Sequence, residues 1–202
     1  MRKESIQLLD LNNLIIDYRN ENERMMKYFD YAPWGDEEKR LADLKERTFN
    51  RKGLTEVLTQ TNEDWDASPE TLANIQKLMD EDSVAVVGGQ QVGLLSGPLY
   101  TVHKMISLIK YAEQKEKELN VPVVPIFWMA GEDHDYDEIN HIYLLNDGRL
   151  NKHTLPHPNH KKMSMSHLEI DHAMAQKWLH EVFSGLVETE HTKTLYKEVA
   201  EC

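Results

Sequence analysis

The sequence has almost no cysteine, no long apolar run and no excess of basic residues, and each shortage excludes a class of protein. Its one cysteine, Cys202, is the last residue, so an internal disulfide and a cysteine-based zinc site are both excluded. No stretch approaches the roughly 18–20 consecutive apolar residues that a membrane span needs. Asp10 and Asp17 interrupt the apolar core that a signal peptide would require. We therefore expect a cytoplasmic protein with no membrane partner.

The charge balance argues against general binding of nucleic acid. There are 35 acidic and 23 basic residues, a net charge of −12, whereas nucleic-acid binding needs a basic surface that displaces counterions. The hydrophobic fraction of 40% and the charged fraction of 29% are typical of a globular protein. A chain of 202 residues is long enough for one domain or one and a half.

Residues 1–80 are predicted to be mainly helical. Ser68 is a capping residue before Pro69, which suits a first helical position, and Leu72 and Ile75 follow at helical spacing. Two earlier amphipathic helices are predicted around residues 41–48 and 54–58, and the aromatic segment at residues 29–38 is predicted to be a loop.

Residues 81–129 are predicted to form a strand, a helix and a second strand. The short β-branched run Ser83–Val87 is typical of a buried parallel strand, and Val121–Met129 is typical of another, with Pro125 at an edge or bulge. The helix between them should begin at Pro98 and be capped at Asn120, and it carries an apolar stripe of Leu99, Val102, Ile106 and Ile109. Such a crossover makes the strands parallel, so the segments GGQQ and GEDHD that follow them should lie side by side at one sheet edge, where α/β proteins bind ligands.

The rest of the chain carries weaker signals. Residues 146–149 (NDGR) predict a hairpin turn, within an inserted loop and hairpin region at about residues 142–170. Helices are predicted at residues 171–186 and 192–202.

The GGQQ segment has the composition of a ligand-binding loop. Gly88 and Gly89 allow backbone N–H groups to approach an anion, and Gln90 and Gln91 both donate and accept hydrogen bonds. The pattern is neither a dinucleotide fingerprint nor a phosphate-binding P-loop. The alternative is a tight turn between strand and helix, in which the glutamines cap backbone groups.

The first turns of the following helix offer an imidazole and an ammonium on one face. Tyr100, His103 and Lys104 are spaced by three and four residues and could bind phosphate or carboxylate. The alternative is a solvated helix face.

The densest group of reactive side chains lies in GEDHDYDEINH, residues 131–141. If this segment is helical, His134, Glu138 and His141 share one face and could act as a general base with an orienting carboxylate, or hold a divalent metal. It is not an HExxH motif, so a metalloprotease is not indicated. The alternative is a solvated acidic loop.

Two further patterns are interpreted without a function. Residues 162–166 (KMSMS) resemble the KMSKS loop of class I aminoacyl-tRNA synthetases, but Met165 stands where the second lysine belongs, and we interpret the match as chance. The histidines without regular ligand spacing are interpreted as surface residues; these are His153, His157, His160, His167 and His172.

Three segments together, VVGGQQVGLLSGPLYTVHK, VPVVPIFWMAGEDHDYDEINH and RLADLKERTFNRKGL, resemble the cysteine-adding enzymes of bacillithiol synthesis, the BshC family. The resemblance implies an α/β fold with a Rossmann-like parallel sheet similar to class I synthetases and nucleotidyl-transferases. It also implies that residues 81–202 are the first part of that core. The remainder of the core, and the coiled coil through which the family forms homodimers, would be absent from this chain.

The function implied by the resemblance is formation of an amide between the carboxyl of cysteine and the amine of glucosaminyl-malate. ATP is implied only by analogy with class I synthetases, and no metal is implied. The residues expected to act in catalysis are His103, Asp133, His134 and Asp135. Those expected to bind substrate or nucleotide are Gly88, Gly89, Gln90, Gln91, Gly97, Tyr100, Lys104, Trp128, Glu132, Asn140 and His141.

Two other function classes stay open from the residues. One is a metal-dependent hydrolase built on the EDHD segment and His141. The other is an inactive fragment that binds a ligand or a partner.

Overall fold

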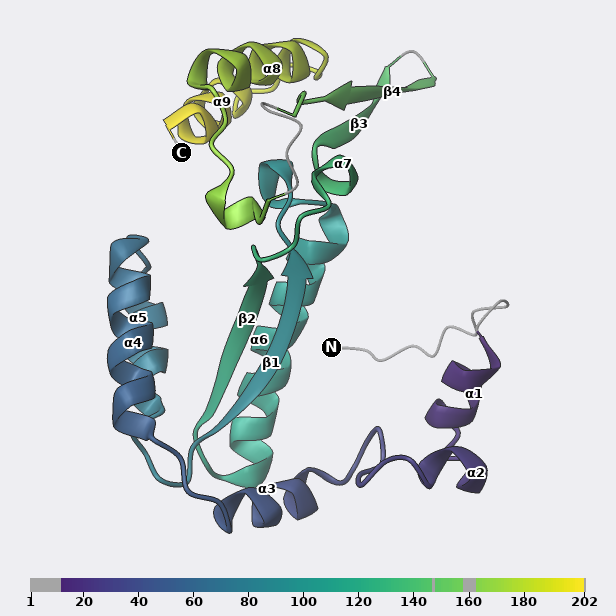
Figure 1. Cartoon of the computed structure of the whole chain (residues 1–202), viewed down its shortest axis with the longest axis vertical. Coiled ribbons are helices and arrows are strands. Elements are labelled where there is room, and N and C mark those ends of the chain that lie inside the picture. The colour runs from purple at the N-terminus through teal and green to yellow at the C-terminus, as the bar shows by residue number, and fades with distance from the viewer. Residues whose placement is uncertain (1–11, 147, 158–162, 202) are drawn as a thin grey trace. The chain divides into compact units, whose positions relative to one another are not determined.

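The computed structural model describes residues 12–146, 148–157 and 163–201, and it divides into two compact units (Figure 1). The first unit comprises the chain up to Val84 together with Glu116–Pro122, and the second comprises Ala85–Lys115 and Val123–Cys202.

The described part of the first unit is helical. Its helices are α1 (Asn13–Arg19), α2 (Glu23–Met26), α3 (Glu37–Lys45), α4 (Arg51–Asp64) and α5 (Pro69–Lys77). Asn50 caps α4 by accepting a hydrogen bond from the Gly53 N–H, and Ser68 caps α5 by accepting one from the Thr71 N–H. The predicted start of α5 at Pro69 is confirmed, as is the loop before α3.

Arg51, the first residue of α4, holds the segment that leads from α5 to the first strand. Its guanidinium donates to the carbonyl oxygens of Leu78 (3.1 Å), Glu81 (2.9 Å) and Ser83 (3.0 Å), and to the Ser83 hydroxyl at 2.8 Å. Ser83 is buried, with 3% of its surface exposed. A single side chain therefore fixes the backbone immediately before the first strand.

The predicted strand–helix–strand arrangement lies mostly in the second unit, with Val84 and the end of the helix from Glu116 assigned to the first. Strands β1 (Val84–Gln91) and β2 (Val123–Ala130) lie side by side and run in the same direction, joined by α6 (Leu99–Leu119) (Figure 1). The positive φ of Asn120, 53°, ends α6 at the predicted residue. Pro125 lies inside β2.

The predicted end of the first strand was wrong. The strand does not stop at Val87 but continues through GGQQ to Gln91. The glycines have a packing reason in the sheet: a Cβ on Gly89 would lie 2.9 Å from the Trp128 carbonyl oxygen on β2, and one on Gly88 would lie 3.5 Å from Leu108 on α6. Gly88 and Gly89 thus allow α6 and β2 to pack closely against β1. From the sequence, these glycines had been interpreted as part of a loop.

The apolar stripe predicted on α6 is not its buried face. Leu99, Ile106 and Ile109 are exposed to 71%, 51% and 46%. Thr101 and Ala112 are the buried residues of this helix, and the side chain of Leu108 reaches Gly88 of β1. The face of α6 that packs on the sheet is the one that carries Leu108, because Gly88 of β1 leaves space for that side chain. The helix sequence alone does not reveal this.

The remainder of the second unit is a hairpin packed against helices. Strands β3 (His141–Asn146) and β4 (Arg149–Thr154) pair in antiparallel fashion with Asn146 opposite Arg149, which confirms the predicted turn. Helices α8 (His172–Ser184) and α9 (Thr192–Glu201) follow, and the short elements are η1 (Leu94–Ser96), α7 (Tyr136–Ile139) and η2 (Met165–His167). The core of this part is formed by Leu155, Trp178, Leu179 and Val182.

Among the helices that the structure describes, none combines the length and apolar character needed to cross a bilayer.

Candidate functional site

The two motifs that the sequence singled out meet at the carboxyl ends of β1 and β2. Gln91, the last residue of β1, donates from Nε2 to Asp133 Oδ2 at 2.5 Å, and Asp133 lies three residues after the end of β2. The same Nε2 lies 3.5 Å from Glu138 Oε2. The prediction that the GGQQ and GEDHD segments are neighbours is therefore confirmed, across 42 residues of sequence.

Gln90 makes a separate set of contacts with α6. The ammonium of Lys104 donates to Gln90 Oε1 at 2.8 Å and to the Gly89 carbonyl at 3.0 Å, and Gln90 Nε2 lies 3.3 Å from the Tyr100 hydroxyl. Because successive side chains of a strand alternate, Gln90 faces the helix while Gln91 faces residues 131–135, the acidic turn. Lys104 has three N–H donors, so one remains for a ligand after these two bonds.

Asp133 is held as an anion by three donors. Besides Gln91, the backbone N–H groups of His134 and Asp135 donate to its Oδ1 at 2.7 and 3.3 Å. The hydrogen bond from Gln91 holds the pKa of the Asp133 carboxyl below its ordinary value of 3.8, and the two backbone N–H groups act in the same direction. Asp133 is therefore a carboxylate at neutral pH and accepts, rather than donates, hydrogen bonds.

His134 lies between two carboxylates. Its Nδ1 is 3.8 Å from Asp133 Oδ1 and its Nε2 is 3.6 Å from Asp135 Oδ1, and half of its side chain (52%) is exposed. The imidazole therefore has a carboxylate oxygen within 4 Å of each of its two ring nitrogens. The three residues also each offer a ligand atom within 4.8 Å of the others, a grouping that could hold a divalent metal.

The helical grouping of His134, Glu138 and His141 does not form. Helix α7 begins after His134 and ends before His141, which is the first residue of β3. The His141 ring is 3.1 Å from Asn140 Oδ1 and packs edge-on against Tyr143. Asn140 is 4% exposed, and its backbone carbonyl accepts a hydrogen bond from the Leu155 N–H at 2.7 Å. Because Asn140 directly precedes β3 and Leu155 directly follows β4, this bond extends the pairing of the β3–β4 hairpin to the end of α7.

The remaining candidate residues lie nearby in the fold but make fewer contacts. Trp128 is 59% exposed and its indole Nε1 is 3.5 Å from Glu132 Oε1. Gly97 adopts a positive φ of 74° in the turn before α6, and Leu95 in that turn has a φ of 53°. His103 is exposed on α6, one turn after Tyr100 and next to Lys104 in the sequence.

One segment of the site was missed by sequence reasoning. Ser164 and Ser166 both donate from their hydroxyls to the Gly131 carbonyl, at 2.6 and 2.8 Å, and the Met165 N–H donates to the Asp133 carbonyl at 2.9 Å. Residues 164–166, part of the KMSMS pattern that we interpreted as a chance match, therefore lie on the acidic turn, and no residue type among them indicates this partner in the sequence. Lys162 and His160 lie outside the described residues.

Two histidines interpreted as surface residues are half-buried. His153 lies on β4 with its Nε2 enclosed by protein, because β4 faces the core formed with α8. The His157 ring packs edge-on against Tyr136 at 4.7 Å. His167 and His172 are exposed as predicted.

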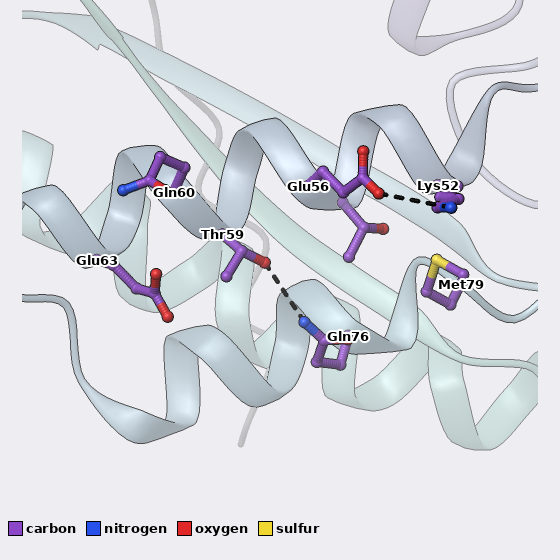
Figure 2. Close-up of a pocket in the computed structure, with 8 residues that line it drawn as sticks. Lys52, Glu56, Thr59, Gln60, Glu63, Gln76 and Met79 are labelled. Atoms are coloured by element: carbon purple, nitrogen blue, oxygen red, sulfur yellow. Dashed lines mark hydrogen bonds and ion pairs between the residues drawn. The ribbon is translucent and has the colours of Figure 1, made fainter.

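A separate groove lies in the first unit and contains none of the predicted residues. It runs between α4 and α5, holds about 480 Å³ and is crossed by the Thr59–Gln76 contact of 3.4 Å (Figure 2). Its lining is mixed in charge and open to solvent; the residues are Lys52, Thr55, Glu56, Thr59, Gln60, Glu63, Gln76 and Met79.

Comparison with known proteins identifies the family. Residues 1–202 match the family described as "Bacillithiol biosynthesis BshC, N-terminal Rossmann-like domain". The chain belongs to the BshC family. Relatives named "Putative cysteine ligase BshC" share 41% identity in Oceanobacillus iheyensis over 98% of this chain and 40% in Bacillus licheniformis over 100%. A third, from Bacillus cereus, shares 43% over 92%.

Membership of the BshC family confirms the Rossmann-like α/β fold, of which the described sheet is a small parallel part. The chain spans 37–38% of the length of the first two of these relatives. The name of these BshC relatives indicates a ligase that uses cysteine. It specifies neither the bond that is formed nor the second substrate.

Proposed function

We propose that this chain supplies part of the site of a ligase that joins the carboxyl of L-cysteine to the amine of glucosaminyl-malate, in the last step of bacillithiol synthesis. Membership of the BshC family and the cysteine-ligase name of its relatives support the ligase class. The observation that carries the proposal is the 2.5 Å contact between Gln91 and Asp133, which joins the two motifs at one sheet edge.

In this proposal, the acidic turn prepares the amine. An amine attacks a carboxyl carbon only after losing its extra proton, and His134 is the exposed group that accepts it. Asp133 and Asp135 flank the imidazole at 3.8 and 3.6 Å and orient its two ring nitrogens. The anionic turn also attracts the ammonium group of the incoming substrate before the proton is transferred.

The face of α6 binds the opposite partner. Lys104, oriented by Gln90 and Gly89, keeps one N–H donor for a phosphate or carboxylate oxygen, and His103 and Tyr100 lie on the same exposed face. A carboxylate does not condense with an amine in water without activation, and ATP would supply that activation by analogy with class I synthetases. The donor set on α6 fits an anionic group of this kind.

The test of this proposal is replacement of His134 by alanine in the longest natural polypeptide that contains this sequence. We expect His134→Ala to abolish the formation of bacillithiol from cysteine and glucosaminyl-malate, measured by mass spectrometry, while the far-UV circular dichroism stays unchanged. His167→Ala is the matched control, because His167 is an exposed histidine outside the two-carboxylate cluster. Normal product formation by His134→Ala would remove His134 from the mechanism.

A metal-dependent hydrolase is the second candidate, favoured by the grouping of Asp133, His134 and Asp135 within 4.8 Å. Carboxylate oxygens and imidazole nitrogens are ordinary ligands of divalent metals. This function differs from the ligase in requiring a bound metal, which chelation tests directly.

A further inference from the structure

The turn that carries Asp133 is held in place by a segment more than thirty residues away in the sequence. Three donors meet on the Gly131 carbonyl oxygen: the Ser164 hydroxyl at 2.6 Å, the Ser166 hydroxyl at 2.8 Å and the Ser166 N–H at 2.9 Å. A carbonyl oxygen has two lone pairs, so this acceptor is fully used.

A fourth contact ties the same segment to Asp133 itself. The Met165 N–H donates to the Asp133 backbone carbonyl at 2.9 Å, so the segment binds the turn at both ends of Gly131–Asp133. Within the turn, the Gly131 N–H donates to the Met129 carbonyl at 2.8 Å, which bends the chain sharply as it leaves β2.

The two segments fit closely at position 131. A Cβ on Gly131 would lie 2.6 Å from the Ser166 hydroxyl, closer than such atoms approach in proteins. Since Gly131 does not have a positive φ, the reason for glycine here is this contact: a side chain at 131 would make the Ser166 hydroxyl turn away from the Gly131 carbonyl.

We infer that Ser164 and Ser166 are positioning residues, which place the Asp133 carboxylate opposite Gln91 by fixing the backbone of Gly131–Asp133. The inference rests on the proposed function for its catalytic consequence, and on hydrogen bonds of the described residues for its geometry. Ser164 has the larger effect, because its hydroxyl is part-buried, whereas the Ser166 hydroxyl is exposed and the Ser166 N–H keeps its own bond when the side chain is removed.

The test follows the groups that donate to Asp133. In the longest natural polypeptide containing this sequence, labelled with ¹⁵N glutamine and histidine, the Gln91 side-chain amide and the His134 backbone amide report on the Asp133 carboxylate. We expect Ser164→Ala/Ser166→Ala to shift both signals and to speed their hydrogen exchange. We expect Ser164→Thr/Ser166→Ala, which keeps the hydroxyl at position 164, to bring both signals and their exchange rates back toward those of the unaltered protein.

The matched control is Ser184→Ala. Ser184 also donates its hydroxyl to a backbone carbonyl at 2.8 Å, that of Glu181, but it lies in α8 outside the acidic turn. A second pair of variants tests the close contact: Gly131→Ala alone, and Gly131→Ala combined with Ser166→Ala, which removes the hydroxyl that the new Cβ would meet. Gly131→Ala alone should shift the His134 signal strongly, and adding Ser166→Ala should reduce that shift.

Kinetics separate positioning from stability. For the folded protein we expect kcat to fall about 10- to 100-fold in Ser164→Ala/Ser166→Ala, the range expected for a misplaced catalytic group, with little change in KM. A loss of stability alone would lower the fraction of folded enzyme and so the apparent kcat, but kcat calculated per folded molecule, with the folded fraction measured by circular dichroism, would stay unchanged.

Each outcome decides one of the two proposals. Unmoved Gln91 and His134 signals in Ser164→Ala/Ser166→Ala, matching Ser184→Ala, would overturn the positioning inference. Shifted signals with unchanged kcat would uphold it and reject the catalytic role of Asp133. Absence of product from the unaltered protein would reject the ligase, while the amide signals would still decide the positioning.

Discussion

Replacing Arg51 with alanine removes four hydrogen bonds at once from the segment between α5 and β1. The guanidinium donates to the carbonyls of Leu78, Glu81 and Ser83 and to the Ser83 hydroxyl, at 2.8–3.1 Å. The bonds to Leu78 and Ser83 are part-buried, whereas the bond to Glu81 is exposed and water can replace it.

The expected loss in the free energy of unfolding follows from these contacts. Taking about 1 kcal/mol for each of the three part-buried bonds and nothing for the exposed one gives about 3 kcal/mol for Arg51→Ala. For a chain of this size that corresponds to a fall in Tm of roughly 6–12 °C. Arg51→Lys should lose about half as much, because one ammonium cannot reach the separate acceptors that the planar guanidinium spans.

The assay is urea unfolding followed by circular dichroism, with Lys52→Ala as the matched control. Lys52 is the next residue of α4, and its exposed ion pair with Glu56 at 3.8 Å should contribute at most about 0.5 kcal/mol. Equal unfolding free energies for Arg51→Ala and Lys52→Ala would refute the view that Arg51 anchors the chain before β1.

Three further predictions concern the second unit. Gln91→Leu should raise the pKa of the Asp133 carboxyl toward 3.8, because it removes the principal donor that lowers it; the ¹³Cγ shift of Asp133 measures this, and an unchanged pKa would contradict the contact. Since the folded-state pKa is lowered, the contribution of this contact to stability is present above the ordinary value of 3.8 and is lost as the pH falls through the lowered pKa. Gly89→Ala should cost about 1–3 kcal/mol in urea unfolding, because its Cβ would lie 2.9 Å from the Trp128 carbonyl, whereas Gly88→Ala, with 3.5 Å to Leu108, should cost less; the reverse order would show that the strands separate easily. Elemental analysis of the purified protein should find no stoichiometric bound metal, because the proposed ligase needs none in the Asp133–Asp135 cluster; a bound metal together with a hydrolytic activity that EDTA abolishes would favour the hydrolase.

The features that sequence predicts well are those set by local chemistry. The cap at Ser68, the first helical position of Pro69 and the turn at residues 146–149 each depend on neighbours within a few residues, and each is present. The meeting of GGQQ with the acidic turn was also predictable, because parallel strands joined by a helix end at the same sheet edge.

The features that sequence missed depend on residues far apart. Gly88 and Gly89 were expected to end the strand, but they lie within it because Leu108 and Trp128 pack against them. Ser164 gave no sign of its partner, since a serine hydroxyl can bond to any carbonyl and Gly131 lies 33 residues earlier. Likewise, the charges around His134 suggested a helix face, whereas Asp133 bonds to the two following N–H groups and delays the helix.

The close fit of Gly131 against Ser166 constrains how this family can diverge. A Cβ at 131 would lie 2.6 Å from the present position of the Ser166 hydroxyl, so that hydroxyl would have to turn away and give up its bond to the Gly131 carbonyl. A side chain at 131 is therefore expected together with the loss of this bond, whichever of the two positions changes first.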